Sequence, residues 1–301
     1  MPTLLTGPVT VTVPATSANL GPGYDALGLA LSLRDAIRAE VVEEQTEVVV
    51  TGEGAAGVPL DETHLVRRSM QRAFDVMGCG APPIALHCSN LIPHGRGLGS
   101  SSAAIVAGVS AARALVGGGS LLVDDDALFA LAAEIEGHPD NVAPAFYGGF
   151  TIAWSAGGRF RATSVAADPR VCAVAFVPPD AVETTVARGL LPDVVPHADA
   201  SLNVGRAALL VAALTRHPEL LLDATEDRLH QPYRASAMPS SAALVDALRA
   251  EGMAAFVSGA GPTVMVLTDL SSQDDVAARA PQGWVSHALS VESRGVEVAA
   301  G

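Results

Sequence analysis

Glycines and serines are concentrated in one short segment, residues 93–102, which precedes a long run of small apolar residues. Three glycines at alternating positions leave the backbone bare, and the alanine- and valine-rich run predicts a helix. Backbone N–H groups at the start of a helix have no partner within the helix, and the helix dipole adds positive potential there. The segment therefore predicts a phosphate-binding loop, in which a serine hydroxyl can also bind Mg²⁺. The alternative is a flexible glycine loop before an ordinary helix.

The residues assigned to this predicted phosphate loop are consecutive: Pro93, His94, Gly95, Arg96, Gly97, Leu98, Gly99, Ser100, Ser101 and Ser102.

Two familiar phosphate-binding motifs do not fit this segment. The P-loop requires a lysine, and all 18 basic residues of the chain are arginine. The same absence excludes a Schiff-base lysine and a lysine general base. The dinucleotide fingerprint requires Gly-x-Gly-x-x-Gly, whereas Gly95, Gly97 and Gly99 are spaced Gly-x-Gly-x-Gly.

Composition narrows the class of protein further. A chain of 301 residues, 49% of them hydrophobic, can build one large domain or two smaller ones with ample cores. A formal charge of −14 and only 4% aromatic residues argue against nucleic-acid binding. The three cysteines lack metal-site spacing, and no signal peptide or transmembrane run is recognisable, so we expect a cytoplasmic protein that does not bind membranes.

Strand and helix patterns alternate without regular βαβ order, which favours an α+β fold over a doubly wound sheet. Two glycines at 157–158 follow a predicted strand and suggest a boundary near residue 160, giving domains 1–160 and 161–301. The expected strands are 9–13, 41–42 paired with 48–50, 84–88, 148–154, 171–177, 254–257 and 264–267. The expected helices are 64–77, 101–116, 124–135, 201–214 and 240–251.

Several further segments join the phosphate loop to form a recognisable series. Residues 14–25 read Pro-Ala-Thr-Ser-Ala-Asn-Leu-Gly-Pro-Gly-Tyr-Asp, and a second glycine loop occupies 258–263. Residues 136–144 read Glu-Gly-His-Pro-Asp-Asn-Val-Ala-Pro, Thr184 and Arg188 precede Leu-Leu-Pro, and 230–234 read His-Gln-Pro-Tyr-Arg. In this order the segments resemble the GHMP kinase superfamily, and in detail its homoserine kinase family. The resemblance runs from about residue 9 to 268, nearly the whole chain.

The resemblance implies a two-domain GHMP kinase fold. Its N-terminal domain is expected to be ribosomal-protein-S5-domain-2-like and its C-terminal domain ferredoxin-like, with ATP bound between them. It also implies transfer of the γ-phosphoryl group of ATP to the side-chain hydroxyl of L-homoserine, giving O-phospho-L-homoserine for threonine biosynthesis. Members of the family are usually homodimers. In such transfers catalysis is mainly positioning and stabilisation of charge.

The resemblance assigns Mg²⁺ to Ser101 and Glu136. Glu134 is the alternative, because the stretch between the glutamate and His138 is shorter here than in some relatives.

The resemblance also assigns the amino-acid substrate. Arg188 and Arg234 match the family's carboxylate-binding arginines, and planar guanidinium groups suit that contact. Asp25 is the expected acceptor for the ammonium group, with three further residues positioning the molecule: Asn19, His138 and Asn141.

The proton acceptor stays open at this point, because an Asp–Lys pair is impossible in a chain without lysine. Either Asp25 or Asp140 takes the proton of the hydroxyl, or the proton passes to the γ-phosphate while Asn19 and Thr184 orient the groups. His138 titrates near neutrality, but we expect it to position the substrate instead.

Three other functions compete with this one. The chain could phosphorylate a mevalonate derivative, a sugar or an erythritol intermediate, although those substrates do not require paired arginines opposite an aspartate. It could be a nucleic-acid module, since the N-terminal fold also occurs in RNA-binding proteins. It could finally be a catalytically inactive regulatory relative.

Overall fold

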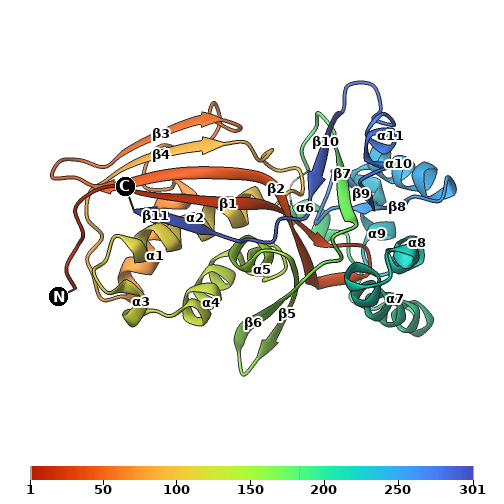
Figure 1. The fold of residues 1–301 in the computed structure, drawn as a ribbon, viewed down its shortest axis with the longest axis horizontal. Coiled ribbons are helices and arrows are strands. Elements are labelled where there is room, and N and C mark those ends of the chain that lie inside the picture. The colour runs from red at the N-terminus through yellow and green to blue at the C-terminus, as the bar shows by residue number, and fades with distance from the viewer. Residues whose placement is uncertain (1, 183, 301) are drawn as a thin grey trace.

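The computed structural model describes residues 2–182 and 184–300, which form two sheets with helices packed against them (Figure 1). The strands are β1 Val9–Asn19, β2 Gly23–Val41, β3 Glu47–Gly52, β4 Ile84–Asn90, β5 Phe150–Ala156, β6 Arg159–Val165, β7 Val171–Val177, β8 Ala254–Val257, β9 Val264–Asp269, β10 Val285–Ser290 and β11 Glu297–Ala300. The α+β architecture predicted from the sequence is confirmed.

The helices fall between these strands and carry most of the connections. They are α1 Leu65–Val76, α2 Ser100–Ala114, α3 Gly119–Leu122, α4 Asp125–Glu136, α5 Val142–Tyr147, α6 Thr184–Gly189, α7 His197–Thr215, α8 Leu221–Ala224, α9 Gln231–Arg234, α10 Pro239–Ala250 and α11 Gln273–Ala277. Each of the five helices expected from the sequence is present, with ends shifted by a few residues.

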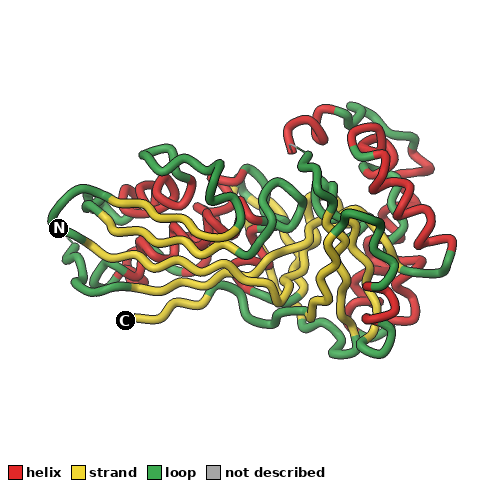
Figure 2. The backbone as a smooth tube through the Cα atoms, turned by 90° about the horizontal axis from the view of Figure 1, so that it is seen from above, coloured by secondary structure: helices red, strands yellow, loops and turns green. Residues whose placement is uncertain are grey.

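The first sheet has the order β11-β1-β2-β4-β3, and the hairpin of β5 and β6 extends it from β2. Helices α1, α2, α4 and α5 lie along one face of this sheet (Figure 2). The small residues of α2 allow its central position, because a Cβ atom on Gly108 would collide with the carbonyl oxygen of Val66 in α1. A larger residue there would push the two helices apart.

The predicted pairing of residues 41–42 with 48–50 is wrong. Strand β4 lies between β2 and β3, so Val41 pairs with Ile84 and Val48 pairs with Leu86. Strands β3 and β4 run parallel, and a parallel pair needs a crossover, which α1 provides. Alternation of valines identifies a strand but carries no information about its partner.

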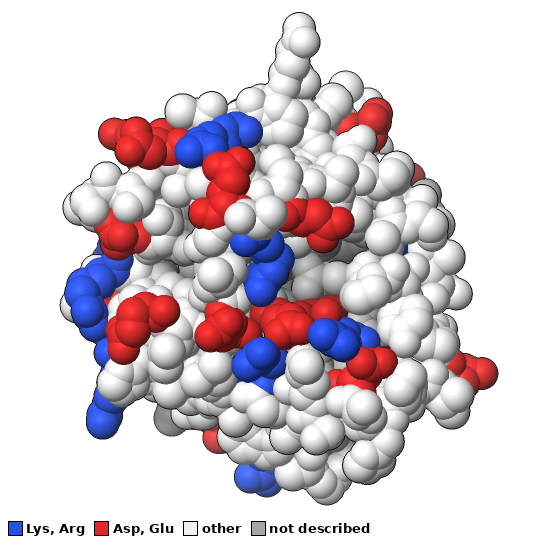
Figure 3. All heavy atoms as spheres, turned by 90° about the vertical axis from the view of Figure 1, so that its right-hand side faces the viewer, with Lys and Arg blue, Asp and Glu red and all other residues white. Residues whose placement is uncertain are grey.

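The second sheet has the order β10-β7-β9-β8 and is antiparallel throughout. By position in the chain this order is fourth, first, third, second, which is the ferredoxin-like order expected for the second domain. Helices α10 and α11 cover one face, where Phe176, Leu248 and Val276 form a separate core. Arginine and acidic side chains lie interspersed over this end of the molecule (Figure 3).

Two strands beyond residue 160 belong to the first sheet. Strand β6 pairs with β5, and β11 returns from the end of the chain to pair with β1. The glycines at 157–158 form the turn of the β5–β6 hairpin. The domain boundary near residue 160 stays a prediction. Within residues 2–182 and 184–300, no helix has the length and apolar character needed to cross a membrane.

Candidate active site

The predicted phosphate loop leads directly into α2. Gly99 is the N-cap residue of this helix, with a left-handed backbone (φ 72°) and no side chain to cap the first N–H groups. Gly95 and Gly97 also have positive φ, 65° and 77°, which favours glycine. The first turn of a 15-residue helix therefore presents uncapped N–H groups beside a bare backbone.

The glycines of the loop are also required by close packing. A Cβ atom on Gly97 would collide with the carbonyl oxygen of Ser258 in the second glycine loop. A Cβ atom on Gly99 would collide with Oγ1 of Thr16 on β1. No larger residue fits at either position while the backbone stays in place.

Three segments that lie far apart in the chain are joined at this point. Ser258 Oγ lies 2.6 Å from the carbonyl oxygen of Gly97 and 2.8 Å from Ser17 Oγ. The N–H of Thr263 donates to Arg96 O at 3.2 Å, and the N–H of Gly259 donates to Ala18 O at 3.0 Å. The phosphate loop, the β1–β2 hairpin tip and the second glycine loop thus form one rigid support.

Glu136, at the end of α4, faces the serines of the loop. Ser101 Oγ and Ser102 Oγ each donate to one of its carboxylate oxygens at 2.8 Å. Glu134 is exposed and makes no such contact among the described residues. A hydroxyl and a carboxylate beside a phosphate loop are a suitable donor set for Mg²⁺, which keeps water and phosphate oxygens as its remaining ligands.

The charged residues of the predicted amino-acid site meet at the tip of the β1–β2 hairpin. Arg188 on α6 donates to both carboxylate oxygens of Asp25, at 3.2 and 2.8 Å, and to Tyr24 Oη at 3.2 Å. Burial by itself lowers the pKa of Arg188, but the hydrogen bond and charge of Asp25 outweigh it and the pKa is raised. The N–H of Asp25 donates to Asn19 Oδ1 at 2.9 Å.

Asn19 and Asp25 reach the site through an unusual backbone. Both have left-handed φ, 67° and 53°, and Leu20 between them has φ 50°. Such conformations are rare for residues with a Cβ and occur where the surrounding structure imposes them. The predicted turn at residues 19–25 and the predicted positions of the Asn19 and Asp25 side chains are therefore linked, because the left-handed backbone of the turn directs these side chains.

Arg234, at the end of α9, is almost fully buried. Its guanidinium donates to the carbonyl oxygens of Ala187, at 3.2 Å, and Gly259, at 3.3 Å. It also lies 5.5 Å from the centroid of the Tyr24 ring, within reach of a cation–π interaction. Burial lowers the pKa of Arg234, although a guanidinium remains charged.

His138 and Asp140 form a pair on the opposite side of the site. His138 Nδ1 lies 2.8 Å from Asp140 Oδ1, and the same oxygen accepts from the N–H of Asn141. Burial by itself lowers the pKa of His138, but the hydrogen bond and charge of Asp140 outweigh it and raise the pKa. Thr16 Oγ1 donates to Asn141 Oδ1 at 2.8 Å, which fixes that amide beneath Gly99.

These parts surround one pocket of about 120 Å³. It is lined by Asn19, Gly95, Arg96, Gly97, Gly99, Ser100, Ser101, Glu136, His138, Asp140, Asn141, Val182, Arg188, Arg234, Gly259, Ala260 and Gly261. Asp25 lies at the edge of the pocket, where its carboxylate accepts a hydrogen bond from Arg188. The side chains of Pro93, Leu98 and Ser102 are buried beneath the loop. The side chain of Thr184 lies outside the described part of the structure.

A second cavity of about 300 Å³ adjoins the pocket and shares Gly95, Ser100 and Ser101 with it. It is largely apolar, and His64 on its wall is buried, with no hydrogen-bond partner for Nδ1 among the described residues. A buried polar atom without a partner is costly, so a ligand that hydrogen-bonds to it would bind favourably.

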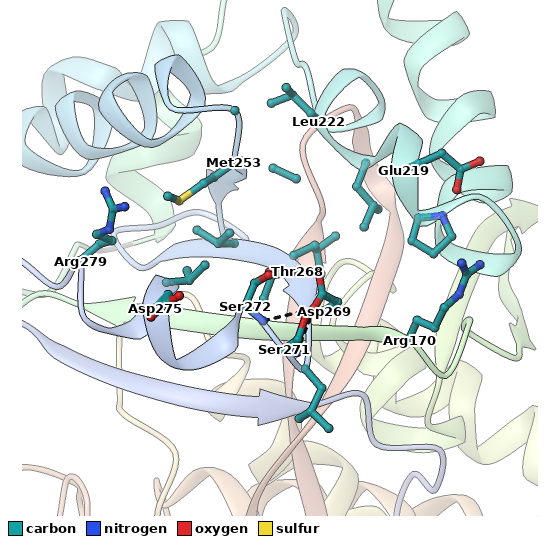
Figure 4. Close-up of a pocket in the computed structure, with 18 residues that line it drawn as sticks. Arg170, Glu219, Leu222, Met253, Thr268, Asp269, Ser271, Ser272, Asp275 and Arg279 are labelled. Carbon is teal, nitrogen blue, oxygen red and sulfur yellow. Dashed lines mark hydrogen bonds between the residues drawn. The ribbon is translucent and has the colours of Figure 1, made fainter.

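A larger hollow, about 880 Å³, lies elsewhere, between β9, α8 and α11 (Figure 4). It contains none of the predicted site residues. Among its charged side chains, Arg170 is paired with Asp168 and Arg279 with Glu251. We therefore place the site at the smaller pocket.

Sequence reasoning missed some of the residues at this site. It noted the second glycine loop but gave no role to Gly259, whose carbonyl oxygen accepts from Asn19 and Arg234. Tyr24 and His230 were quoted only as parts of motifs. Both residues could have been found from their position next to predicted site residues, since Tyr24 precedes Asp25 and His230 stands one helical turn before Arg234.

Comparison with known proteins agrees with this geometry. Residues 64–149 match the GHMP kinases N terminal domain, and residues 206–286 match the GHMP kinases C terminal domain. The chain is 57% identical to the homoserine kinase of Streptomyces avermitilis over 290 residues, covering 96% of this chain and 95% of the relative. It is 47% identical to that of Mycolicibacterium smegmatis, covering 95% and 92%.

Solved structures show the same relationship. A homoserine kinase from Cytophaga hutchinsonii superposes with a TM-score of 0.83 at 26% identity, covering 99% of both chains. A mevalonate diphosphate decarboxylase from Staphylococcus aureus shares the fold at 14% identity, with a TM-score of 0.69 and 98% coverage of both chains. By family match, identity and fold, this chain is a member of the GHMP kinase family.

Proposed function

We propose that this protein is a homoserine kinase, which transfers the γ-phosphoryl group of ATP to the side-chain hydroxyl of L-homoserine. One observation carries the choice of substrate. Arg188 and Arg234 line one small pocket beside the phosphate loop, and Asp25 forms an ion pair with Arg188 at its edge. An α-amino acid offers a carboxylate to the arginines and an ammonium group to the aspartate. The relatives that are 45–57% identical bear the name homoserine kinase.

The pairing of Arg188 with Asp25 suits a zwitterionic ligand. The two side chains already form an ion pair with N–O distances of 2.8 and 3.2 Å. A substrate that carries both charges replaces each partner of that pair, so neither charge is left without a counter-charge. A neutral alcohol would offer no such exchange and would leave the pair closed.

ATP would be held in the two adjoining cavities. The triphosphate fits the uncapped start of α2 and the glycine loop. The base fits the apolar cavity, where His64 Nδ1 lacks a partner among the described residues. Mg²⁺, bound by Ser101 and Glu136, would neutralise charge on the phosphate oxygens, and the serine–glutamate hydrogen bonds hold these groups together before it binds.

The residues around the pocket then orient the hydroxyl and stabilise charge. Asn19 is held by Gly259, and Asn141 by Thr16, so both amides are fixed before substrate binds. His138, held by its hydrogen bond to Asp140, helps to position the substrate. Asp25, Asp140 and Thr184 complete the assigned catalytic set. The proton of the hydroxyl leaves to one of the two aspartates or to the γ-phosphate.

ADP release tests the proposal directly. Purified protein is given Mg-ATP with L-homoserine, mevalonate, galactose, L-serine or L-threonine in separate reactions. Turnover with L-homoserine alone is expected. Turnover with mevalonate or galactose would keep the kinase fold and overturn the assignments of Asp25, Arg188 and Arg234. Absence of turnover with every alcohol would favour a regulatory relative, and measured ATP binding would then test the phosphate loop separately.

The proposal includes a homodimer in the cytoplasm, as the family resemblance implies. Light scattering on the purified protein measures its mass in solution. A mass near twice 30.5 kDa is expected, and a mass near 30.5 kDa would remove this part of the proposal.

A further inference from the structure

His230 is completely buried behind the pocket, and both of its ring nitrogens have partners. Nε2 lies 2.7 Å from the carbonyl oxygen of Gly21, in the turn of the β1–β2 hairpin. Nδ1 lies 3.2 Å from Nη1 of Arg234, one helical turn further along the chain. The imidazole therefore connects two segments separated by 209 residues.

Those two partners allow only one form of the ring. A carbonyl oxygen can only accept, so Nε2 must carry the proton and donate to Gly21. A guanidinium can only donate, so Nδ1 must be unprotonated and accept from Arg234. The neutral Nε2–H tautomer satisfies both contacts, whereas an imidazolium would place two cations in contact. Burial lowers the pKa of His230, and the charge of Arg234 adds to this effect. The carboxylate of Asp227, 3.5 Å from Nε2, acts in the opposite direction without reversing the shift, so the neutral ring is favoured.

The backbone around His230 is held by hydrogen bonds that do not involve its ring, although Oδ2 of Asp227 also lies 3.5 Å from Nε2. The carboxylate of Asp227 accepts from the N–H groups of Leu229, His230 and Gln231, at 2.9, 3.2 and 2.8 Å. Gln231 Oε1 in turn accepts from the N–H of Val257 on β8, at 2.6 Å. A change confined to the ring of His230 therefore leaves the course of the chain fixed by these contacts.

Arg234 depends on uncharged partners for its orientation. Within the described residues it donates to Ala187 O, Gly259 O and His230 Nδ1. Of these three acceptors, His230 Nδ1 alone belongs to a side chain and can be removed by substitution. The positive charge of Arg234 is left for an anionic group that enters the pocket.

We infer that His230 is a positioning residue, whose neutral ring fixes the guanidinium of Arg234 relative to the hairpin tip that carries Asn19 and Asp25. The inference rests on the proposed function in one respect, because its kinetic test uses L-homoserine. His230 itself does not contact substrate. It sets the distance between the group that binds the carboxylate and the groups that bind the ammonium end.

Two substitutions separate the two contacts of the ring. In His230→Asn the amide oxygen takes the place of Nδ1 and still accepts from Arg234. In His230→Gln the longer amide takes the place of Nε2 and still donates to Gly21, so the contact with Arg234 is lost. Losing a hydrogen bond to a charged group predicts a KM for L-homoserine raised about 10-fold or more in His230→Gln. We expect the KM for ATP to stay unchanged and His230→Asn to restore most of the affinity.

A double variant shows whether His230 acts through Arg234. Added to Arg234→Ala, the change His230→Gln is expected to raise the KM for L-homoserine no further, because the partner is already gone. A further rise of the same size in that background would overturn the inference. So would an unchanged KM in the single variant, or equal rises in KM for L-homoserine and ATP, which indicate a general loss of structure.

A measurement on the unmodified protein is independent of turnover. Nitrogen NMR on ¹⁵N-histidine-labelled protein, with His230 assigned by its absence in His230→Asn, reports which ring nitrogen carries the proton. A neutral Nε2–H ring near pH 7 is expected, and an imidazolium or an Nδ1–H ring would overturn the inference. If the wild type fails to phosphorylate L-homoserine, the proposed function fails while this spectrum still tests the position of the ring.

Discussion

The two sides of the pocket use different kinds of binding groups. On the phosphate side the binding groups are backbone N–H donors exposed by glycines, and a Cβ atom would collide with Ser258 O at Gly97 and with Thr16 Oγ1 at Gly99. On the amino-acid side they are charged side chains, Arg188, Arg234 and Asp25, held by one another and by buried polar groups. At Gly97 and Gly99 the phosphate side has no room for an added Cβ, whereas the amino-acid side depends on the charges of its side chains.

This difference predicts how substitutions on each side of the pocket affect activity. Adding a Cβ to the phosphate side moves backbone, and with it every N–H that faces the phosphates. Removing a charge from the amino-acid side leaves the backbone in place and weakens a single ligand. Substitutions on the first side should therefore abolish activity, and those on the second should act on one Michaelis constant.

The largest effect is expected for Gly97→Val. Its side chain would collide with the Ser258 carbonyl and occupy a backbone conformation with φ 77°, so we expect nucleotide binding and turnover to be lost. Gly95→Ala is the matched control, because its φ of 65° is similar but its Cβ would meet only Ala181, at 3.4 Å. Titration with ATP measures both variants. Retained affinity in Gly97→Val would disprove the loop assignment.

On the other side, Arg188→Ala should raise the KM for L-homoserine by about 10- to 150-fold, since a charge-assisted contact contributes about 1.5–3 kcal/mol. The KM for ATP should change little. Steady-state kinetics with each substrate varied in turn gives both constants. Equal changes in the two would contradict the division between the sides. Arg188→Lys is the control that keeps the charge and loses the bidentate geometry.

A smaller and more selective effect is expected for the predicted metal site. Glu136→Gln removes the charge that faces Ser101 and Ser102, so more Mg²⁺ should be needed for half-maximal turnover, by about 10-fold. Glu134→Gln is the matched control, because that side chain is exposed and distant from the serines. Turnover is followed while free Mg²⁺ is varied at saturating ATP. The opposite result for the two variants would move the metal to Glu134.

The smallest effect concerns stability. Because the folded-state pKa of His138 is raised, its pair with Asp140 stabilises the protein fully below the unfolded pKa of about 6.5. That contribution declines as pH rises through the folded pKa. His138→Asn should thus lower the free energy of unfolding by on the order of 1 kcal/mol at acidic pH, and less at alkaline pH. Urea unfolding of both proteins across this range checks it, and a difference that grows with pH would contradict the pairing.

Those parts of the candidate site whose conformation depends on a short segment of the chain could be predicted from the sequence. A glycine-rich turn before a small-residue helix specifies its own conformation, so the glycine loop and α2 were predicted within a residue or two, while binding of phosphate by the loop stays a prediction. Motif resemblance then supplied Arg188, Arg234 and Asp25, which the structure brings to one place. The α+β fold was predicted from the mixed order of strand and helix patterns, and the ferredoxin-like second sheet from the same resemblance.

Non-local pairing could not be predicted in this way. The position of β4 between β2 and β3 depends on a crossover through α1, which valine alternation does not encode. The contact between His230 and Gly21 joins residues 209 positions apart, and no local pattern marks either as a partner of the other. Both depend on how whole elements pack, so they emerge only from the folded chain.

The return of β11 to the first sheet has a consequence for how the protein is made. Its residues pair with the start of β1, as Glu297 does with Thr12, so this pairing cannot form until residues 297–300 have been synthesised. Until then one edge of β1 stays open, and open strand edges invite intermolecular pairing. Such distant contacts also slow folding. During synthesis the first sheet is therefore incomplete for a time. In that period chaperones or rapid folding limit its aggregation.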